Sequence, residues 1–220
     1  MYCILRLAIR LLGKLKTSGE HNVPGSGGVL YCPNHLSDAD PPTLFVSLPR
    51  RAWYVGKSEL FEIPVVGAFF RSFRGFPIKR DSADRAALRK AERLLMRGEP
   101  LVLFPEGRCA QDGVLARLQP GAALLAIRTN CPIVPVGIAG TNRLLPYGSR
   151  LPRFTHQPVT VMFGPPIYPS EFSHLANSRA IEAITEKLGE RIAGMTNQIP
   201  PPFHRKIRRS VPLADADAQE

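Results

Sequence analysis

The stretch "GVLYCPNHLSDADPPTLFVSL", residues 28–48, contains in succession the two kinds of element that decide the fold. Residues 28–32 are an apolar run of strand length, whereas residues 41–48 begin with two prolines and continue as an apolar helical segment. Proline is favoured at the first helical position, and it disfavours helical geometry in the residue before it. We therefore predict a strand, a polar loop and a helix whose N-cap is Asp40.

The same alternation recurs along the chain. Further apolar runs that read as strands cover residues 52–55, 75–78, 101–105, 132–138 and 159–164. Helical patterns cover residues 84–98, 121–129 and 171–194, and Ser82 is a candidate cap of the first of these. Alternating strands and helices with nearly unbroken apolar strands predict an α/β fold, with a mixed, mostly parallel sheet flanked by helices and an N-terminal amphipathic helix.

Polar side chains follow several of the predicted strands. His35 comes after the strand at 28–32, Lys79 and Arg80 after that at 75–78, and Glu106 after that at 101–105. In open α/β sheets, ligands bind outside the carboxyl ends of the strands. If these strands are parallel neighbours, the four side chains converge on one edge of the sheet.

The first residues, "MYCILRLAIRLLGKLK", form an amphipathic helical pattern. One side carries cations and the other carries apolar side chains, namely Arg6, Arg10 and Lys14 against Leu5, Ile9, Leu12 and Leu15. The interleaved charges exclude a membrane span. Either an interfacial anchor or a helix packed on its own domain explains the pattern. We predict an interface helix at residues 1–17, a domain at 18–198 and a disordered tail, basic and then acidic, at 199–220.

The charge distribution suggests the kind of partner. The net charge is +11, and residues 63–80 and 113–170 contain no Asp or Glu. Such an excess suits nucleic acid, an anionic membrane or a phosphorylated small molecule. No recognition helix, zinc finger or aromatic stacking platform is apparent, so we predict phosphate-bearing substrates and anionic lipid rather than nucleic acid. The four cysteines lie far apart without metal-ligand spacing, which favours reduced thiols in the cytosol over a zinc site or disulfides.

His35 and Asp40 are five residues apart, so they can meet only if the chain turns between them. A carboxylate on one ring nitrogen fixes the tautomer and leaves the other nitrogen as a base. Such a pair is suited to deprotonating a substrate hydroxyl that attacks an activated acyl group directly.

Other interpretations of this segment remain open. In one interpretation Asp40 serves only as a helix cap and His35 is a purely structural loop histidine. His35, Asp38 and Asp40 could instead ligate a metal in a hydrolase. Ser37 could be a nucleophile, although it lacks a G-x-S-x-G elbow.

Four segments together resemble the conserved boxes of the glycerolipid acyltransferases, the 1-acylglycerol-3-phosphate O-acyltransferases and their relatives. "NHLSDAD" (34–40) resembles the first box, "GFPIKRD" (75–81) the second, "FPEGR" (104–108) the third and "PIVPVGIAG" (132–140) the fourth. Their order and spacing also agree, and the similarity runs from about Gly19 to Pro169. The third box departs from the family, because Arg108, Cys109 and Ala110 stand where Thr-Arg-Ser is usual.

The resemblance implies a role for each matching residue. His35 would be the general base and Asp40 its orienting partner. Lys79 and Arg80 would hold the acceptor phosphate. The remaining matches would shape the acceptor pocket (Glu106, Gly107 and Arg108) or line the acyl-donor side (Pro135).

The resemblance also implies substrates and a location. The donor would be acyl-CoA or acyl carrier protein, acting as co-substrate with no cofactor or metal. The acceptor would be a lysophospholipid, most simply 1-acylglycerol-3-phosphate giving phosphatidic acid, although another lyso-lipid or hydroxyl acceptor remains open. The expected location is the cytoplasmic face of the cell membrane, with peripheral attachment to an anionic surface.

Overall fold

A computed structural model describes residues 2–79, 84–110, 113–146, 148–149, 151–155 and 157–200, and of residues 2–6 it describes the backbone alone. Arg80 and Ser82, together with nearly all of the predicted C-terminal tail, lie outside this range. The division of the chain into three parts stays a prediction. Among the described residues, no helix has the length and apolar character needed to cross a membrane.

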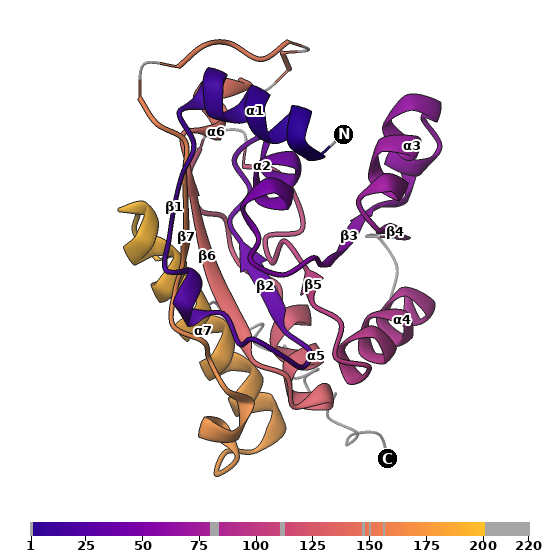
Figure 1. Ribbon diagram of the computed structural model, residues 1–220. Helices are drawn as coiled ribbons and strands as arrows, with labels where there is room; N and C mark the ends of the chain where they lie inside the picture. Colours follow the sequence, from indigo (N-terminus) through magenta and orange to yellow (C-terminus); the bar gives the residue numbers. More distant parts are fainter. Residues whose placement is uncertain are drawn as a thin grey trace, which may run out of the picture.

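The described residues form one seven-stranded sheet with the order β1-β7-β6-β2-β5-β3-β4 (Figure 1). The strands are β1 (Lys16–Ser18), β2 (Leu30–Pro33), β3 (Trp53–Lys57), β4 (Gly75–Ile78), β5 (Leu101–Val102), β6 (Ile133–Ala139) and β7 (Thr160–Phe163). All neighbouring strands are parallel except β6 and β7. The predicted mixed, mostly parallel sheet is confirmed.

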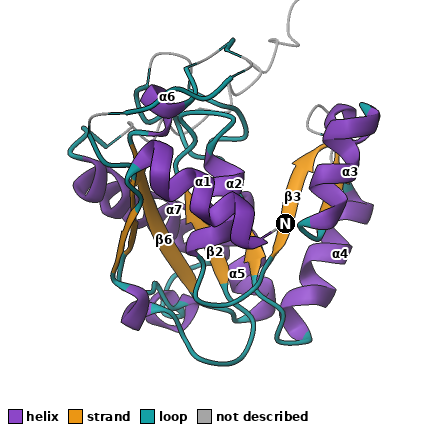
Figure 2. Cartoon of the chain, turned by 45° about the horizontal axis from the view of Figure 1, so that its top comes forward, coloured by secondary structure: helices purple, strands orange, loops and turns teal. Residues whose placement is uncertain are grey.

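Helices cover both faces of the sheet. They are α1 (Tyr2–Gly13), α2 (Asp40–Ser47), α3 (Pro64–Ser72), α4 (Arg85–Met96), α5 (Gly121–Thr129), α6 (Thr141–Leu144) and α7 (Asn177–Thr196). Figure 2 shows α1 and α2 in front of β2 and β6. Successive β2 residues point to opposite faces, so Leu30 packs in the core formed with α4, α5 and α7, whereas Tyr31 packs with Leu44 of α2. Burial on both faces explains why the strands are apolar throughout.

Three expected helix starts differ from the structure. Helix α2 begins at Asp40 itself, and its cap position is Ala39. Helix α4 is capped by Asp84, whose carboxylate accepts from the Ala87 N–H at 2.9 Å, so the cap is not Ser82. The helix predicted over 171–194 is in fact a 3₁₀ turn at Pro169–Phe172 followed by α7, because the extended backbone of Ala176 separates the two.

Some elements were not predicted from the sequence. Strand β1 has three exposed residues and no apolar alternation, and it pairs with β7 along the edge of the sheet. Helix α3 is a short apolar run that periodicity alone does not separate from a strand. Strand β5 is shorter than predicted, since the chain after Val102 leaves the sheet to form the loop that carries Glu106.

Candidate active site

The loop between β2 and α2 brings His35 and Asp40 together. His35 Nδ1 lies 2.9 Å from Asp40 Oδ2, and the two residues are 9% and 0% exposed. The same carboxylate oxygen accepts the backbone N–H groups of Leu36 at 2.6 Å and Ser37 at 2.8 Å. Asp40 therefore folds the loop around itself and holds the imidazole at the same time.

These bonds assign the proton on the imidazole. Asp40 Oδ2 already accepts two backbone N–H groups, so it acts as an acceptor toward His35 and Nδ1 carries the hydrogen. In the neutral ring this leaves Nε2 without a hydrogen and available as a base. The ring of Phe104 packs against the imidazole with 4.3 Å between centroids, which restricts its rotation.

The predicted helix cap at Asp40 is wrong by one position, and its carboxylate has a different task. As the first residue of α2, followed by Pro41 and Pro42, Asp40 sends its carboxylate back to the preceding loop instead of forward to the helix N–H groups. Pro41 lacks an N–H and so leaves no donor unpaired at this turn. The prolines thus set the turn that brings the dyad together.

Glu106 fastens the His35 loop to the loop after β5. Its Oε1 accepts the His35 N–H at 2.7 Å, and its Oε2 accepts the Ala116 N–H at 2.8 Å. The Ala110 N–H also donates to the His35 carbonyl at 2.7 Å. Burial raises the pKa of the Glu106 carboxyl to about 7, partly offset by the two backbone N–H donors. Glu106 and His35 thus come together as β2–β5 adjacency predicted.

Two further side chains of the loop are structural braces that sequence reasoning did not identify. The Asn34 amide donates to the Ile138 carbonyl at 2.9 Å and accepts from the Ile138 N–H at 2.7 Å, so it ties the loop to β6. Ser37 Oγ donates to the Leu145 carbonyl at 2.7 Å. Since that hydroxyl points to a backbone carbonyl and not to His35, the geometry does not favour Ser37 as a nucleophile. Asn34 is the first residue of the segment that resembles the first box, so its place in that segment was the sequence feature that could have identified it.

A small, mostly apolar pocket of about 30 Å³ opens beside His35. It lies between α2, β3 and α3 and is lined by His35, Pro41, Tyr54, Val55, Gly56, Lys57, Leu60, Phe70 and Phe104. Lys57 brings a cation to this pocket from the end of β3, where it pairs with Glu59 at 2.9 Å. Applying the strand-end rule to β3 would have found Lys57.

Lys79 lies farther from the dyad than the sequence suggested. It follows β4, the edge strand, which β5 and β3 separate from β2. Lys79 is exposed, and its backbone N–H donates to the Asp84 carboxylate at 3.1 Å. Lys79 and His35 both follow the carboxyl ends of strands at the same edge of the sheet. However, Lys57 and not Lys79 lines the pocket next to His35.

The remaining residues of the third box differ in accessibility. Gly107 has a φ of +73°, a conformation that favours glycine, and its N–H donates back to the Phe104 carbonyl at 3.1 Å. Arg108 is exposed. Burial and the neighbouring carboxylates of Asp40 and Asp38 raise the pKa of the Cys109 thiol to about 12, so it is a poor nucleophile.

Pro135 lies in the middle of β6, in register with Cys32 of β2, and is buried. The structure therefore places it inside the sheet, below the rim that carries His35. Its predicted part in lining the donor side stays a prediction.

The metal-dependent alternative finds no ligand set in the described part of the chain. No three His, Cys, Asp or Glu side chains gather there as a metal site requires. Asp38 is exposed, whereas Asp40 is fully buried.

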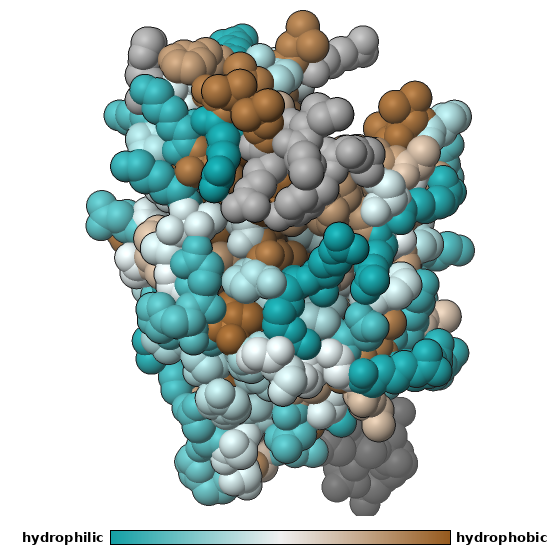
Figure 3. Space-filling view, in the orientation of Figure 1, coloured by the Kyte–Doolittle hydropathy of each residue, from teal (hydrophilic) through white to brown (hydrophobic). Residues whose placement is uncertain are grey.

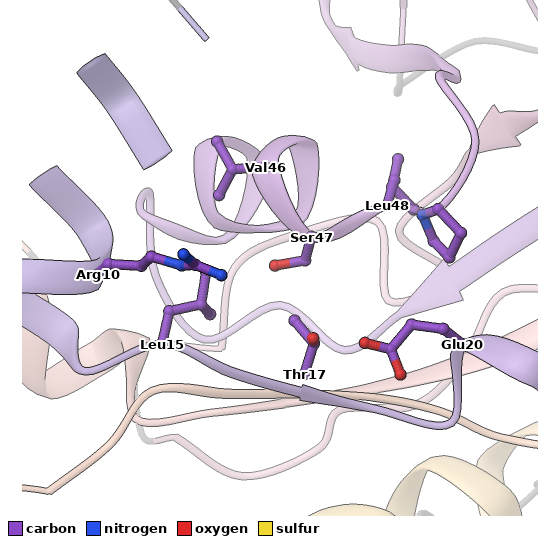
Figure 4. A pocket seen from close by; sticks show the side chains of 8 residues that line it. Arg10, Leu15, Thr17, Glu20, Val46, Ser47 and Leu48 are labelled. Carbon is purple, nitrogen blue, oxygen red and sulfur yellow. The ribbon is translucent and has the colours of Figure 1, made fainter. Parts of the chain in front are cut away.

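A second pocket, of about 340 Å³, lies under α1 (Figure 4). Arg10 reaches it from α1, Thr17 from β1 and Ser47 from the end of α2, and Glu20 stands at its far side. None of its lining residues belongs to the dyad or to the β5 loop, so the larger cavity is not where the candidate chemistry lies.

A buried His–Asp pair stands at the carboxyl end of a mostly parallel α/β sheet, and the hydroxyl of Ser37 in the same loop is turned to a backbone carbonyl. Comparison with known proteins identifies the family of the chain. The model of the family described as Acyltransferase matches residues 14–139, and the chain belongs to this family.

The named relatives are 1-acyl-sn-glycerol-3-phosphate acyltransferases. The chain is 29% identical to a 1-acyl-sn-glycerol-3-phosphate acyltransferase of Bacillus subtilis over 197 residues, covering 89% of this chain and 94% of the other. It is 33% identical to a chloroplastic enzyme of that name from Brassica napus, covering 72% of this chain, but it spans only 46% of that longer protein. The crystal structure of the 1-acyl-sn-glycerophosphate acyltransferase PlsC from Thermotoga maritima aligns with a TM-score of 0.62 and 26% identity, covering 86% of this chain and 78% of PlsC.

Proposed function

We propose that this chain transfers a fatty acyl group from an acyl thioester to the free hydroxyl of 1-acylglycerol-3-phosphate, giving phosphatidic acid. The observation that carries the proposal is the His35–Asp40 contact at 2.9 Å, which leaves a basic ring nitrogen at the rim without a nucleophile directed at it from the described residues. The activity for which the relatives are named supports the substrate class. The thioester carrier is coenzyme A or acyl carrier protein.

In the proposed reaction His35 Nε2 takes the proton of the acceptor hydroxyl as its oxygen attacks the thioester carbonyl. The C–O bond forms, the C–S bond breaks and the leaving thiolate takes the proton from the imidazolium. Asp40 stabilises the positive ring between these two proton transfers, and no acyl-enzyme forms.

Binding would use the rest of the rim. The pocket beside His35 suits the part of the acyl chain next to the thioester, since Val55, Leu60 and Phe70 in its lining are apolar. Lys79 and Arg80, as predicted, would attract the acceptor phosphate together with Lys57. Arg108 would help to shape the acceptor pocket.

The proposed role of Glu106 is to position His35. Both of its oxygens accept backbone N–H groups, so its first task is to hold two loops together. Contact between Glu106 and a glycerol hydroxyl, which the resemblance implies, would have to use the remaining lone pairs.

The proposed location is the cytoplasmic face of the cell membrane, with peripheral attachment. The basic excess of +11 and the lipid nature of the proposed acceptor support an anionic surface as partner. The anchor needs a correction, however. Ile9 is 6% exposed and Leu12 is partly buried, so the apolar side predicted to enter lipid packs on the domain instead.

The decisive assay uses purified protein with palmitoyl and oleoyl thioesters of both carriers against a panel of lyso-lipids, with products identified by mass. We expect an acylated lyso-lipid that requires the acceptor hydroxyl and persists in the presence of a chelator. Hydrolysis of the thioester to free fatty acid without any acylated acceptor, or complete loss of transfer with chelator, would contradict the proposal.

A further inference from the structure

The exposed side of α1 is continuous with the loop that follows α6. The Thr155 N–H donates to the Leu12 carbonyl at 2.9 Å, and the Val159 N–H donates to the Gly13 carbonyl at 2.7 Å. Lys14 Nζ lies 5.6 Å from the centroid of the Phe154 ring. Residues 151–155 are therefore attached to the last turn of α1, and the two segments present one surface.

This surface carries large apolar side chains that face outward. Leu7 and Leu11, one turn apart on α1, are 58% and 62% exposed. In the loop, Leu151 is 76% and Phe154 is 56% exposed. Figure 3 shows apolar side chains gathered at the top of the molecule over α1 and this loop, with hydrophilic side chains beside them. We call these four residues the α1–loop surface.

The surroundings of the α1–loop surface are basic. Exposed cations lie beside it, namely Lys14 directly after α1, Arg143 of α6 and Arg153 of the loop. Neither residues 2–19 nor residues 113–170 contain an Asp or Glu, so the segments that build the surface bring no carboxylate to it. Exposed leucines and a phenylalanine amid cations match a membrane interface, where headgroups are anionic and the acyl boundary lies just below.

The position of the surface connects it with the candidate active site. Ser37 Oγ, in the loop of the dyad, donates to the Leu145 carbonyl, and the Arg153 N–H donates to the Leu144 carbonyl at 2.7 Å. Figure 1 shows α1 and the loop at the end of the sheet to which the strands β2 and β6 point. A membrane meeting this surface would therefore lie at the same end of the molecule as His35.

We propose that the α1–loop surface is a two-part docking site for an anionic lipid bilayer, in which Leu151 and Phe154 insert beside Leu7 and Leu11. The second part, residues 151–154, belongs to the folded domain and is separate in sequence from α1. The inference deepens the proposed function and rests on it only in that the acceptor is a lipid.

The test measures binding of the full chain to vesicles by sedimentation. One vesicle type is pure phosphatidylcholine and the other has about one phosphatidylglycerol in three lipids. The apolar test variant is Leu151→Ser/Phe154→Ser. Its control is Met96→Ser, a residue 74% exposed at the end of α4, near the amino ends of the strands. The charge variant is Lys14→Gln/Arg153→Gln, and its control is Arg93→Gln/Arg97→Gln, two exposed arginines of α4 and its cap.

We expect the wild-type chain to prefer the anionic vesicles. The apolar variant should lower the partition coefficient roughly tenfold or more, and the charge variant by a similar factor at low salt, with both controls within about twofold of wild type. Thermal unfolding at the wild-type temperature excludes misfolding as the cause.

Three results would overturn the inference. The first is unchanged vesicle binding by the apolar variant, and the second is equal binding to both vesicle types. The third is a dimer in solution that Leu151→Ser/Phe154→Ser dissociates, because the surface would then join two copies of the chain. Activity on a soluble short-chain lyso-lipid separates this test from the proposed function. If the chain acylates the soluble lyso-lipid with normal kcat but does not bind vesicles, only the docking site is rejected. If the chain binds vesicles but acylates no acceptor, only the proposed reaction is rejected.

Discussion

The centre and the edge of the site rim are built in opposite ways. At the centre, above β2 and β5, His35, Asp40 and Glu106 are at most 9% exposed. Asp40 Oδ2 and both Glu106 oxygens accept hydrogen bonds there from the imidazole or from backbone N–H groups. At the edge, above β3 and β4, Lys79 is exposed, and Lys57 makes one ion pair with Glu59 in which both side chains are about half exposed.

This difference follows from the sheet and suits two tasks. Strand β2 lies between β5 and β6, so the loop that follows β2 bonds both to Glu106 in the loop after β5 and to Ile138 of β6. Proton transfer needs such fixed geometry, since small misplacements of reacting groups are costly. Attraction of a phosphate falls off slowly with distance and tolerates mobile side chains. The centre is therefore expected to control kcat, and the edge to control acceptor binding.

The largest effect is expected at the centre, from His35→Ala. Loss of the general base should lower kcat by ~100-fold or more, and the fold should persist because Asp40 keeps its two backbone donors. Initial rates with a radiolabelled thioester, together with a thermal melt, check both parts. Transfer within about tenfold of wild type by a folded variant would remove His35 from the mechanism.

Glu106→Gln should have the next largest effect. Glutamine offers one acceptor oxygen where the carboxylate offers two, so either the His35 or the Ala116 N–H loses its partner. If Glu106 positions His35, kcat should fall about tenfold while the acceptor KM stays within about twofold. A rise in acceptor KM with unchanged kcat would instead assign Glu106 to direct acceptor binding.

Glu106 also predicts a pH dependence of stability. Its folded pKa of about 7 exceeds the unfolded value near 4.5, so the folded state binds this proton more tightly. The free energy of unfolding should then decrease as pH rises from about 4.5 to about 7, by about 3 kcal/mol from this group, and level off above. Urea unfolding across this range should show the decrease in wild type and a smaller one in Glu106→Gln. If the free energy of unfolding depends on pH in the same way in both proteins, Glu106 is not the source of the decrease.

A smaller effect is expected at the edge. Lys57→Ala should raise the acceptor KM about fivefold with little change in kcat or in the donor KM, because the lost cation is exposed and screened. Lys187→Ala is a matched control, since Lys187 forms a similarly exposed ion pair with Glu171 at 2.7 Å on α7. Comparison with Lys79→Ala shows which strand end meets the phosphate. A large loss of kcat in Lys57→Ala would break the division between centre and edge.

The smallest effect is expected for Cys109→Ser, which should leave kcat within about twofold of wild type. Burial and nearby carboxylates keep the Cys109 thiol protonated, so it is not available as a nucleophile. Slow alkylation at neutral pH would agree. Rapid labelling of Cys109 accompanied by loss of transfer would show that the thiol takes part after all.

Much of the site could be predicted because its signals are local. His35 and Asp40 share one loop, and the two prolines after them already imply the turn that lets them meet. The adjacency of His35 and Glu106 followed from the strand-end rule, provided that β2 and β5 were neighbours. The strand-end rule would also have found Lys57, but only the position of β3 next to β5 shows that Lys57 and not Lys79 lines the pocket beside His35. The bonds from Asn34 to Ile138 span 104 residues, which no local pattern can indicate.

The packing of α1 and the pairing of β1 also could not be predicted from local sequence patterns. The amphipathic pattern of α1 was correct as a helix, but the pattern could not say which side would pack. Ile9 and Gly13 face the domain, so Leu7 and Leu11 are left outside, next to a loop more than 130 residues away in sequence. Strand β1 has no apolar alternation and exists only because the edge of β7 offers it backbone partners.

The sequence by itself determined the class of fold, the dyad and the family, because apolar periodicity, proline geometry and residues of one loop are properties of short segments. Only the tertiary structure decided the order of the strands. That order places Glu106 beside His35, Lys57 closer than Lys79, and the loop at 151–155 against α1. Strand order depends on how distant elements bury the two faces of the sheet. The free energy of that burial is a property of the whole fold, so no single stretch of the sequence predicts it.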